Sequence, residues 1–119
     1  MKIAVTSQNR KHITEHAGRC RKFWIFSIED KEVIEKRLLE LPKEQSFHDS
    51  PPHEEHPLDD VDVLISGGMG QGLVRRLKTK NIDCLVTNET DPETAVSLFL
   101  HGKLTGKQPR PHSRGRDEE

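Results

Sequence analysis

Two short apolar segments with a helix-like segment between them constrain the fold more than any other feature of the chain. Residues 61–66 (VDVLIS) and 82–87 (IDCLVT) are nearly continuous apolar runs, a pattern typical of strands buried on both faces of a sheet. Between them, residues 69–80 (MGQGLVRRLKTK) place Leu73 and Leu77 on one side of a helix. The three segments predict a strand–helix–strand unit with parallel strands and a right-handed crossover.

The flanking segments extend this unit. Residues 2–6 (KIAVT) and 22–29 (KFWIFSIE) are rich in β-branched and aromatic residues and are predicted to be strands. Residues 90–102 (TDPETAVSLFLHG) predict a second helix, which Asp91 caps and Gly102 ends. We therefore expect an α/β fold.

Residues 32–41 (EVIEKRLLEL) are ambiguous. Ile34, Leu38 and Leu41 share one helical face, and the composition slightly favours a helix. A strand at this position would instead pair with residues 22–29 across a short turn.

The remaining segments are polar. Residues 42–60 are rich in proline and contain His48, His53 and His56. A connection of this length is functional, flexible, or contains a short helix near its end. Residues 105–119 are predicted to be a flexible polar tail, which leaves residues 1–104 as one domain.

Composition excludes several classes of protein. The chain of 119 residues has a formal net charge of -1, which argues against a general binder of nucleic acid or acidic membranes. No apolar run is long enough to cross a bilayer. Two cysteines, Cys20 and Cys84, are too few for a disulfide framework. We expect a cytoplasmic protein with a small core.

The segment LISGGMGQGLVRRL (64–77) places four glycines between a strand and a helix. Unpaired amide groups and the helix dipole favour an anion at such a position. A Walker loop requires Gly-Lys-Ser/Thr, which is absent. A dinucleotide fingerprint that starts at Gly68 would require a glycine where Leu73 stands. The glycines therefore either form a tight turn only or hold a less common anion.

The loop between the first two strands carries metal-binding residue types. His12, His16 and Cys20 recur at every fourth position, and their donor atoms suit zinc, iron or copper. Zinc held with a further histidine from the 42–60 segment is one interpretation, although the spacing matches no standard zinc module. In the alternative interpretation, Cys20 packs at the start of its strand and the histidines are solvated.

The two loops are expected to meet. If strands 2–6 and 61–66 are neighbours, both loops lie at the crevice where open α/β sheets usually bind ligands. One loop supplies imidazole, thiol and positive charge, and the other supplies backbone amides. This combination suits a negatively charged metal–sulfur cluster better than an organic substrate.

Four motifs, MKIAVTSQ, ITEHAGRCRKFWIF, DVLISGGMGQG and AVSLFLHGKL, resemble in order and spacing the dinitrogenase iron–molybdenum cofactor biosynthesis family. The resemblance covers residues 1–104. It implies a ribonuclease H-like motif, with a mixed five-stranded sheet, parallel central strands and flanking helices. It also implies that residues 32–41 form an edge strand, which we adopt in place of the helix.

The resemblance further implies non-enzymatic binding and carriage of an iron–molybdenum, iron–sulfur or molybdenum–copper–sulfur cluster, with cofactor-assembly proteins as partners. The candidate cluster-binding residues carried over from the family are His16, Gly18, Arg19, Cys20, Gly67, Gly68, Met69 and Gly70, and those for the metal itself are His16 and Cys20. The chain has Ala17 where the family commonly has an aromatic residue, which would widen the pocket. It has Gln71-Gly72 where the family often has proline, which would loosen the pocket.

There are three alternative functions. The main alternative is a regulatory or protein-interaction domain of the same fold without a cluster. A nuclease requires carboxylates that converge on the sheet, and the first strand has none. A zinc or nickel module at residues 48–56 (HDSPPHEEH) lacks the rigidity of a closed site.

Overall fold

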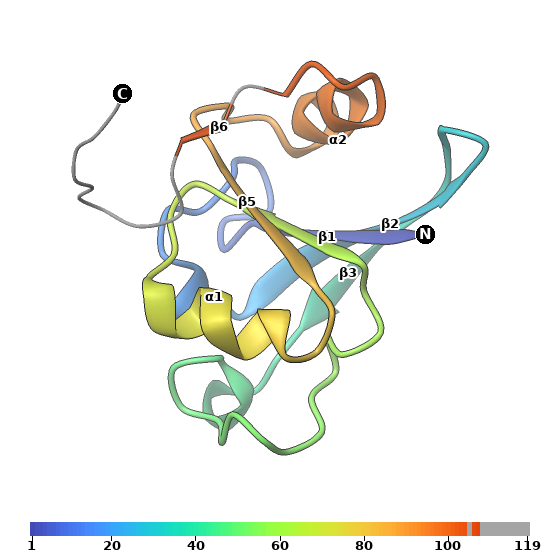
Figure 1. Cartoon of the computed structure of the whole chain (residues 1–119). Helices are drawn as coiled ribbons and strands as arrows, with labels where there is room; N and C mark the ends of the chain where they lie inside the picture. The colour runs from blue at the N-terminus through green and yellow to red at the C-terminus, as the bar shows by residue number, and fades with distance from the viewer. Residues whose placement is uncertain (105, 108–119) are drawn as a thin grey trace.

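A computed structural model of the chain describes residues 1–104 and 106–107. Its sheet is built outward from a central strand, β1, which is paired on both sides (Figure 1). The strands are β1 (Lys2–Thr6), β2 (Lys22–Glu29), β3 (Glu32–Glu40), β4 (Val63–Ser66), β5 (Asp83–Thr87) and β6 (Gly106–Lys107). Their order in the sheet is β3-β2-β1-β4-β5-β6. The pairs β1/β4 and β4/β5 are parallel, and the other three pairs are antiparallel.

This arrangement confirms the expected mixed α/β sheet. The unit β4–α1–β5 is the predicted strand–helix–strand unit, with α1 at Gln71–Lys78. Five strands were expected, and the two-residue β6 adds a sixth at the outer edge of β5. Apart from this strand, the predicted polar tail at 105–119 lies outside the described residues.

The edge position of β3 is also confirmed, and the tight turn before it explains why helix propensity does not decide this segment. Asp30 and Lys31 both have positive φ angles, 52° and 64°. Two consecutive residues with positive φ are typical of the hairpin turn whose twist matches that of its two strands. The turn directs β3 back along β2, where it pairs from Glu32 to Glu40 with one register shift, at which Ile34 has no partner. Ile34, one of the three residues that suggested a helix, is 58% exposed.

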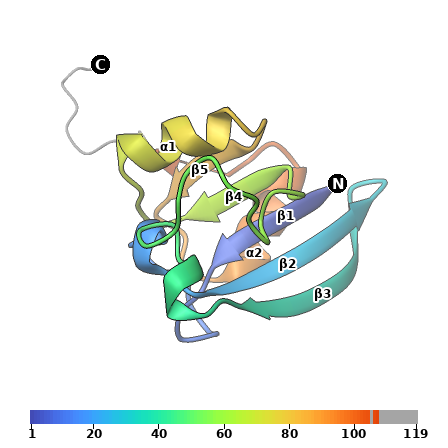
Figure 2. The same ribbon diagram turned by 90° about the horizontal axis from the view of Figure 1, so that it is seen from below.

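The two faces of the sheet bury separate apolar clusters, because successive strand residues point to opposite sides. In β1, Ala4 belongs to one cluster, whereas Ile3 and Val5 belong to the other. The helix α2 (Pro92–Leu100) covers the cluster around Ile3 and Val5. Figure 2 shows α1 and α2 on opposite sides of the sheet.

The helix α2 begins as the sequence predicts. The Asp91 carboxylate accepts a hydrogen bond from the backbone N–H of Thr94 at 2.8 Å. Gly102, with a φ of 70°, follows the end of the helix. No helix of the described residues is long and apolar enough to span a membrane.

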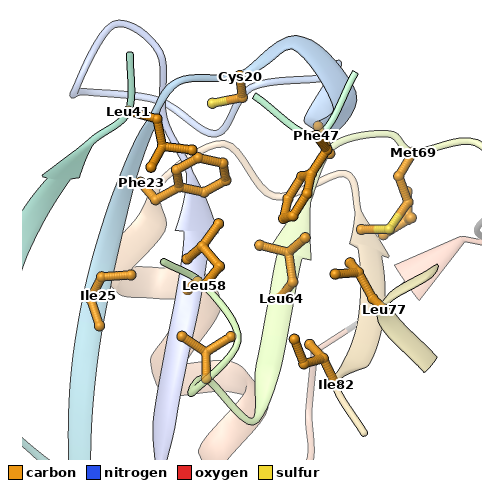
Figure 3. Close-up of a cluster of buried hydrophobic side chains, with 14 residues drawn as sticks. Cys20, Phe23, Ile25, Leu41, Phe47, Leu58, Leu64, Met69, Leu77 and Ile82 are labelled. Atoms are coloured by element: carbon orange, nitrogen blue, oxygen red, sulfur yellow. The ribbon is translucent and has the colours of Figure 1, made fainter. Parts of the chain in front are cut away.

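The segment 42–60, which we call the strap, completes the face that α1 covers. It starts with a short 3-10 helix, η2 (Lys43–Gln45), and it buries Phe47 and Leu58 against the sheet. In Figure 3 the Phe47 ring reaches between the side chains of Phe23 and Met69, and its centroid lies 6.0 Å from that of Phe23. Of the three alternatives for this segment, the short helix near its end is absent, because residues 57–60 form a turn.

Arg76 of α1 binds the strap to the rest of the domain. Its guanidinium donates hydrogen bonds to the carbonyl oxygens of Phe47, Ser50 and Pro51 at 2.8, 3.1 and 3.2 Å. It also lies over the Phe47 ring, 5.2 Å from the centroid. Carbonyl oxygens of an irregular segment would otherwise need water. The strap is therefore a packed part of the domain.

His56 is buried within the strap, contrary to the interpretation of solvated histidines. Its ring stacks on Phe47 at 4.7 Å. One nitrogen, Nε2, lies 2.7 Å from the carbonyl oxygen of Gln45, and the other, Nδ1, accepts from the N–H of Leu58 at 3.1 Å. Both contacts are satisfied by the neutral ring with its proton on Nε2.

Burial is the main cause that lowers the pKa of His56 from its ordinary value of 6.5, and the charges of Arg76 and Lys80 lower it further. The carbonyl of Gln45 and the carboxylate of Asp59 act in the opposite direction. A second proton on His56 would also displace the N–H of Leu58 from Nδ1.

We predict that the free energy of unfolding falls as the pH is lowered from about 7.5 to 5.5. In this range the unfolded chain protonates His56 near its ordinary pKa, whereas the folded chain resists protonation, so the unfolded state binds more protons. The measurement is urea unfolding at several pH values. His56→Gln should reduce the pH dependence, and the matched variant His53→Gln, at an exposed position of the strap, should retain it. An equal pH dependence in the wild type and His56→Gln would contradict this account.

Candidate functional site

Three loops meet at the C-terminal ends of the parallel strands β1, β4 and β5. The loop after β1, residues 7–21, which we call the first loop, is hydrogen-bonded to both the loop after β4 and the loop after β5. It is joined to the glycine loop (residues 67–70) by bonds from Gly67 N–H to the Thr14 carbonyl (2.9 Å) and from Ala17 N–H to the Gly68 carbonyl (3.1 Å). The two loops that the sequence analysis paired are therefore in direct contact.

Two fully buried hydroxyl groups at the ends of the strands stabilise this contact between the loops. Thr6 at the end of β1 and Ser66 at the end of β4 are both 0% exposed, and their hydroxyl oxygens lie 3.1 Å apart. The Thr6 hydroxyl donates to the Thr14 carbonyl. The Ser66 hydroxyl oxygen lies 3.0 Å from the carbonyl oxygens of both Thr14 and Gly68. Strand ends and loops thus share one hydrogen-bonded network, which the sequence analysis did not identify.

The glycines of this region have different roles. A Cβ atom at Gly68 would collide with the carbonyl oxygen of Glu15, and one at Gly67 would lie only 3.1 to 3.3 Å from Thr14 and Glu15. At Gly70 and Gly72 a Cβ atom would meet nothing within 4 Å. Close approach of the first loop therefore requires glycine at 68, whereas packing does not require it at 70 or 72.

Beyond Gly68, the glycine loop presents unused hydrogen-bond donors. Among the described residues, no hydrogen bond uses the backbone N–H groups of residues 69–73. These groups belong to the end of the glycine loop and the first turn of α1, whose N-cap residue, Gly70, provides no side-chain cap. Free N–H groups and the positive end of the helix dipole together favour an anion.

The first loop places two of the predicted residues on the surface beside these donors. His16 precedes a 3-10 helix, η1 (Ala17–Arg19), and the side chains of His16 and Arg19 are exposed. Figure 2 shows η1 next to the strap and near the start of α1. Six of the predicted site residues thus lie together at the C-terminal ends of β1 and β4: His16, Gly18, Arg19, Gly67, Gly68 and Gly70.

Cys20 and Met69 point into the core instead. Cys20 is 2% exposed, and both residues belong to the apolar cluster of Figure 3. The Cys20 thiol donates to the carbonyl oxygen of Lys22 at 3.1 Å, and burial raises the pKa of this thiol. A buried, protonated thiol is a poor metal ligand. The geometry therefore favours the alternative in which Cys20 packs at the start of its strand.

Ala17 is buried in the same cluster, at 0% exposure. The expectation that its small side chain widens the pocket is therefore wrong, because this side chain is a core residue rather than a wall of the crevice. Gln71 and Gly72 form the first residues of α1.

A self-contained metal site is not found. Among residues 1–104, 106 and 107, no three His, Cys, Asp or Glu side chains are grouped so that they could hold a metal ion. His56 is occupied by the strap contacts described above, and Cys20 is buried. The zinc interpretation of the first loop therefore has no support in the structure.

A shallow hollow of about 260 Å³ lies beside the loop after β5, with Asn88, Thr90 and Leu98 in its walls. The Ile13 N–H donates to the Thr90 carbonyl at 2.8 Å, so the first loop also contacts the loop after β5.

Comparison with protein families gives a match over most of the chain. The family model described as "Dinitrogenase iron-molybdenum cofactor" matches residues 1–102. Among curated proteins, the uncharacterized protein MJ0580 of Methanocaldococcus jannaschii is 30% identical over 106 residues, which are 87% of this chain and 89% of that protein.

Solved structures share the fold. MJ0327 of Methanocaldococcus jannaschii, described as a "putative dinitrogenase", superposes with a TM-score of 0.69 at 20% identity, covering 90% of this chain and 94% of that one. TM1290 of Thermotoga, described as a "putative NifB protein", gives a TM-score of 0.64 at 18% identity, with coverages of 96% and 98%.

We predict that Gly68→Ala lowers the free energy of unfolding by about 1–3 kcal/mol, because the new Cβ atom would force the two loops apart. The matched variant Gly72→Ala meets no neighbour and should raise it by about 0.5–1 kcal/mol through helix propensity. Chemical unfolding of both variants provides the measurement. Equal stabilities would show that the loops do not pack as described.

Proposed function

The chain belongs to the dinitrogenase iron–molybdenum cofactor family, and from this premise we propose that it binds and carries an anionic metal–sulfur cluster without catalysing a reaction. The cargo would be an iron–molybdenum, iron–sulfur or molybdenum–copper–sulfur cluster, exchanged with cofactor-assembly proteins. Free rather than disulfide-bonded Cys20 and Cys84 suit a reducing compartment such as the cytoplasm.

One observation carries the proposal: the free N–H groups of residues 69–73 lie next to the exposed side chains of the first loop. Inorganic sulfide and molybdate-type anions accept hydrogen bonds from such N–H groups, and a helix N-terminus stabilises their charge. A cluster brings most of its own ligands, so the protein needs to supply only a few donors. The exposed side chains of His16 and Arg19 and the free N–H groups of residues 69–73 provide such a small set of groups.

The side chains of the first loop have complementary roles. The Arg19 guanidinium would pair with the negative charge of the cluster. The exposed His16 imidazole would coordinate a metal atom at the cluster surface, because imidazole suits iron and copper. Cys20 supports the loop from the core and ligates only if η1 opens.

We also propose that the strand order β3-β2-β1-β4-β5, with β2 antiparallel to β1, is a ribonuclease H-like motif. A nuclease of this fold would need carboxylates that converge on the sheet to hold its metal ions. The central strand, KIAVT, contains no carboxylate. The carrier function is therefore favoured over a nuclease.

The test is an anaerobic titration with two probes, copper(I) plus tetrathiomolybdate, and ferrous iron plus sulfide. Gel filtration and elemental analysis then measure the metal that stays with the protein. The wild type should retain at least one probe and acquire its colour. His16→Ala should weaken retention about 10-fold or more, through loss of a ligand, and raised salt should weaken it as well, because the charge contacts are exposed.

His12→Ala is the matched control, because His12 is an exposed histidine of the same loop and, among the described residues, its ring is hydrogen-bonded only to the side chain of Asn9. It should bind as the wild type does. No retention of either probe by the wild type would contradict the carrier function and favour a regulatory or protein-interaction domain without a cluster.

A further inference from the structure

His48 of the strap lies against the loop that carries His16. Its backbone N–H donates to the carbonyl oxygen of Gly18, in the middle of η1, at 2.6 Å. The neighbouring Phe47 is buried in the core and fastened by Arg76. These contacts fix the backbone of His48 next to the candidate site, while its side chain remains 51% exposed.

The two ring nitrogens of His48 have distinct partners. Nδ1 lies 3.0 Å from Oδ1 of Asp49, and Nε2 lies 3.2 Å from Nη2 of Arg19. A guanidinium group can only donate hydrogen bonds, so Nε2 accepts, and Nδ1 donates its proton to the carboxylate. The hydrogen bond from His48 lowers the pKa of Asp49, which keeps this carboxylate ionised.

This arrangement is the one found around metal-bound histidines. Such a histidine typically donates its second ring N–H to a carboxylate, which fixes the tautomer and makes the coordinating nitrogen more basic. In His48 that nitrogen is Nε2, and its one hydrogen-bond partner among the described residues is the side chain of Arg19. Arg19 is exposed, so it can turn from Nε2 to an anionic ligand, with which a guanidinium group forms stronger bonds.

We propose that His48 is a second imidazole ligand of the cargo site and that Asp49 is its positioning residue. Nε2 of His48 would coordinate a metal atom of the cluster, while Arg19 pairs with a sulfide of the same cluster. The strap would thus add a third segment to the site, next to η1 and the glycine loop. This inference rests on the proposed function, because the ligand is the same metal–sulfur anion.

The experiment uses the full chain and the probe copper(I) plus tetrathiomolybdate, which is diamagnetic and allows NMR. His48→Gln should weaken retention of the probe by ~10-fold or more, and Asp49→Asn should weaken it while His48 remains present. His53→Gln, an exposed histidine five residues further along the strap, should bind as the wild type does. If the wild type retains only the iron–sulfide probe, the same variants are compared by the ¹⁴N coupling of imidazole in pulsed EPR.

A second readout separates a ligand from a merely structural residue. In ¹H–¹⁵N spectra of the histidine side chains, the probe should shift the Nε2 resonance of His48 and leave those of His53 and His56 unchanged. The His56 signals also report whether the strap of each variant stays folded.

Failure of the two proposals can be distinguished. If the wild type and His48→Gln retain the probe equally and the His48 resonance does not move, the inference is wrong while the carrier function stands. If the wild type retains no probe, both are wrong.

Discussion

The contact between the first loop and the glycine loop is the constraint on which the structure of the candidate site depends. It exists because β1 and β4 run parallel and end together, because Thr6 and Ser66 place buried hydroxyls between the loops, and because Gly68 has no side chain. A buried hydroxyl without a partner is costly. Each hydroxyl here therefore requires the loop carbonyl that it contacts, so the strands and loops fix one another.

The same arrangement of the glycine loop provides the backbone N–H donors of the candidate site. The N–H of Gly67 bonds the Thr14 carbonyl, and the N–H of Gly68 lies 3.3 Å from the Ser66 hydroxyl oxygen. The chain then enters α1 without a capping side chain. The N–H groups of residues 69–73, at the end of the glycine loop and in the first turn of α1, have no hydrogen-bond partner among the described residues, and a preorganised donor loses little entropy when a ligand binds. The glycines thus serve two purposes, close packing at 68 and an open approach at 70.

Sequence reasoning identified the strands and helices well, because apolar runs, turn residues and helix caps are local signals. It placed β1 and β2 at their observed bounds, and β3 required the resemblance, since helix propensity and strand pairing conflict there. The sequence left open whether Cys20 is a ligand or packs at the start of its strand, and it did not place Ala17 in the core, because both depend on how η1 turns inward. The packing of the strap, with Phe47 and Arg76 in contact, is likewise non-local. His48 was noted as a histidine, but its contact with Gly18 spans about thirty residues of chain and has no local signal.

The most direct test of the central claim is a map of backbone amide shifts in ¹H–¹⁵N spectra as the copper(I)–tetrathiomolybdate probe is added anaerobically. If free donors at the start of α1 hold the anion, the largest shifts and the greatest protection from hydrogen exchange will fall on residues 69–73, with smaller shifts at 16–19. Shifts centred instead on the hollow beside residues 88–90, with the amides of 69–73 unchanged, would contradict the account.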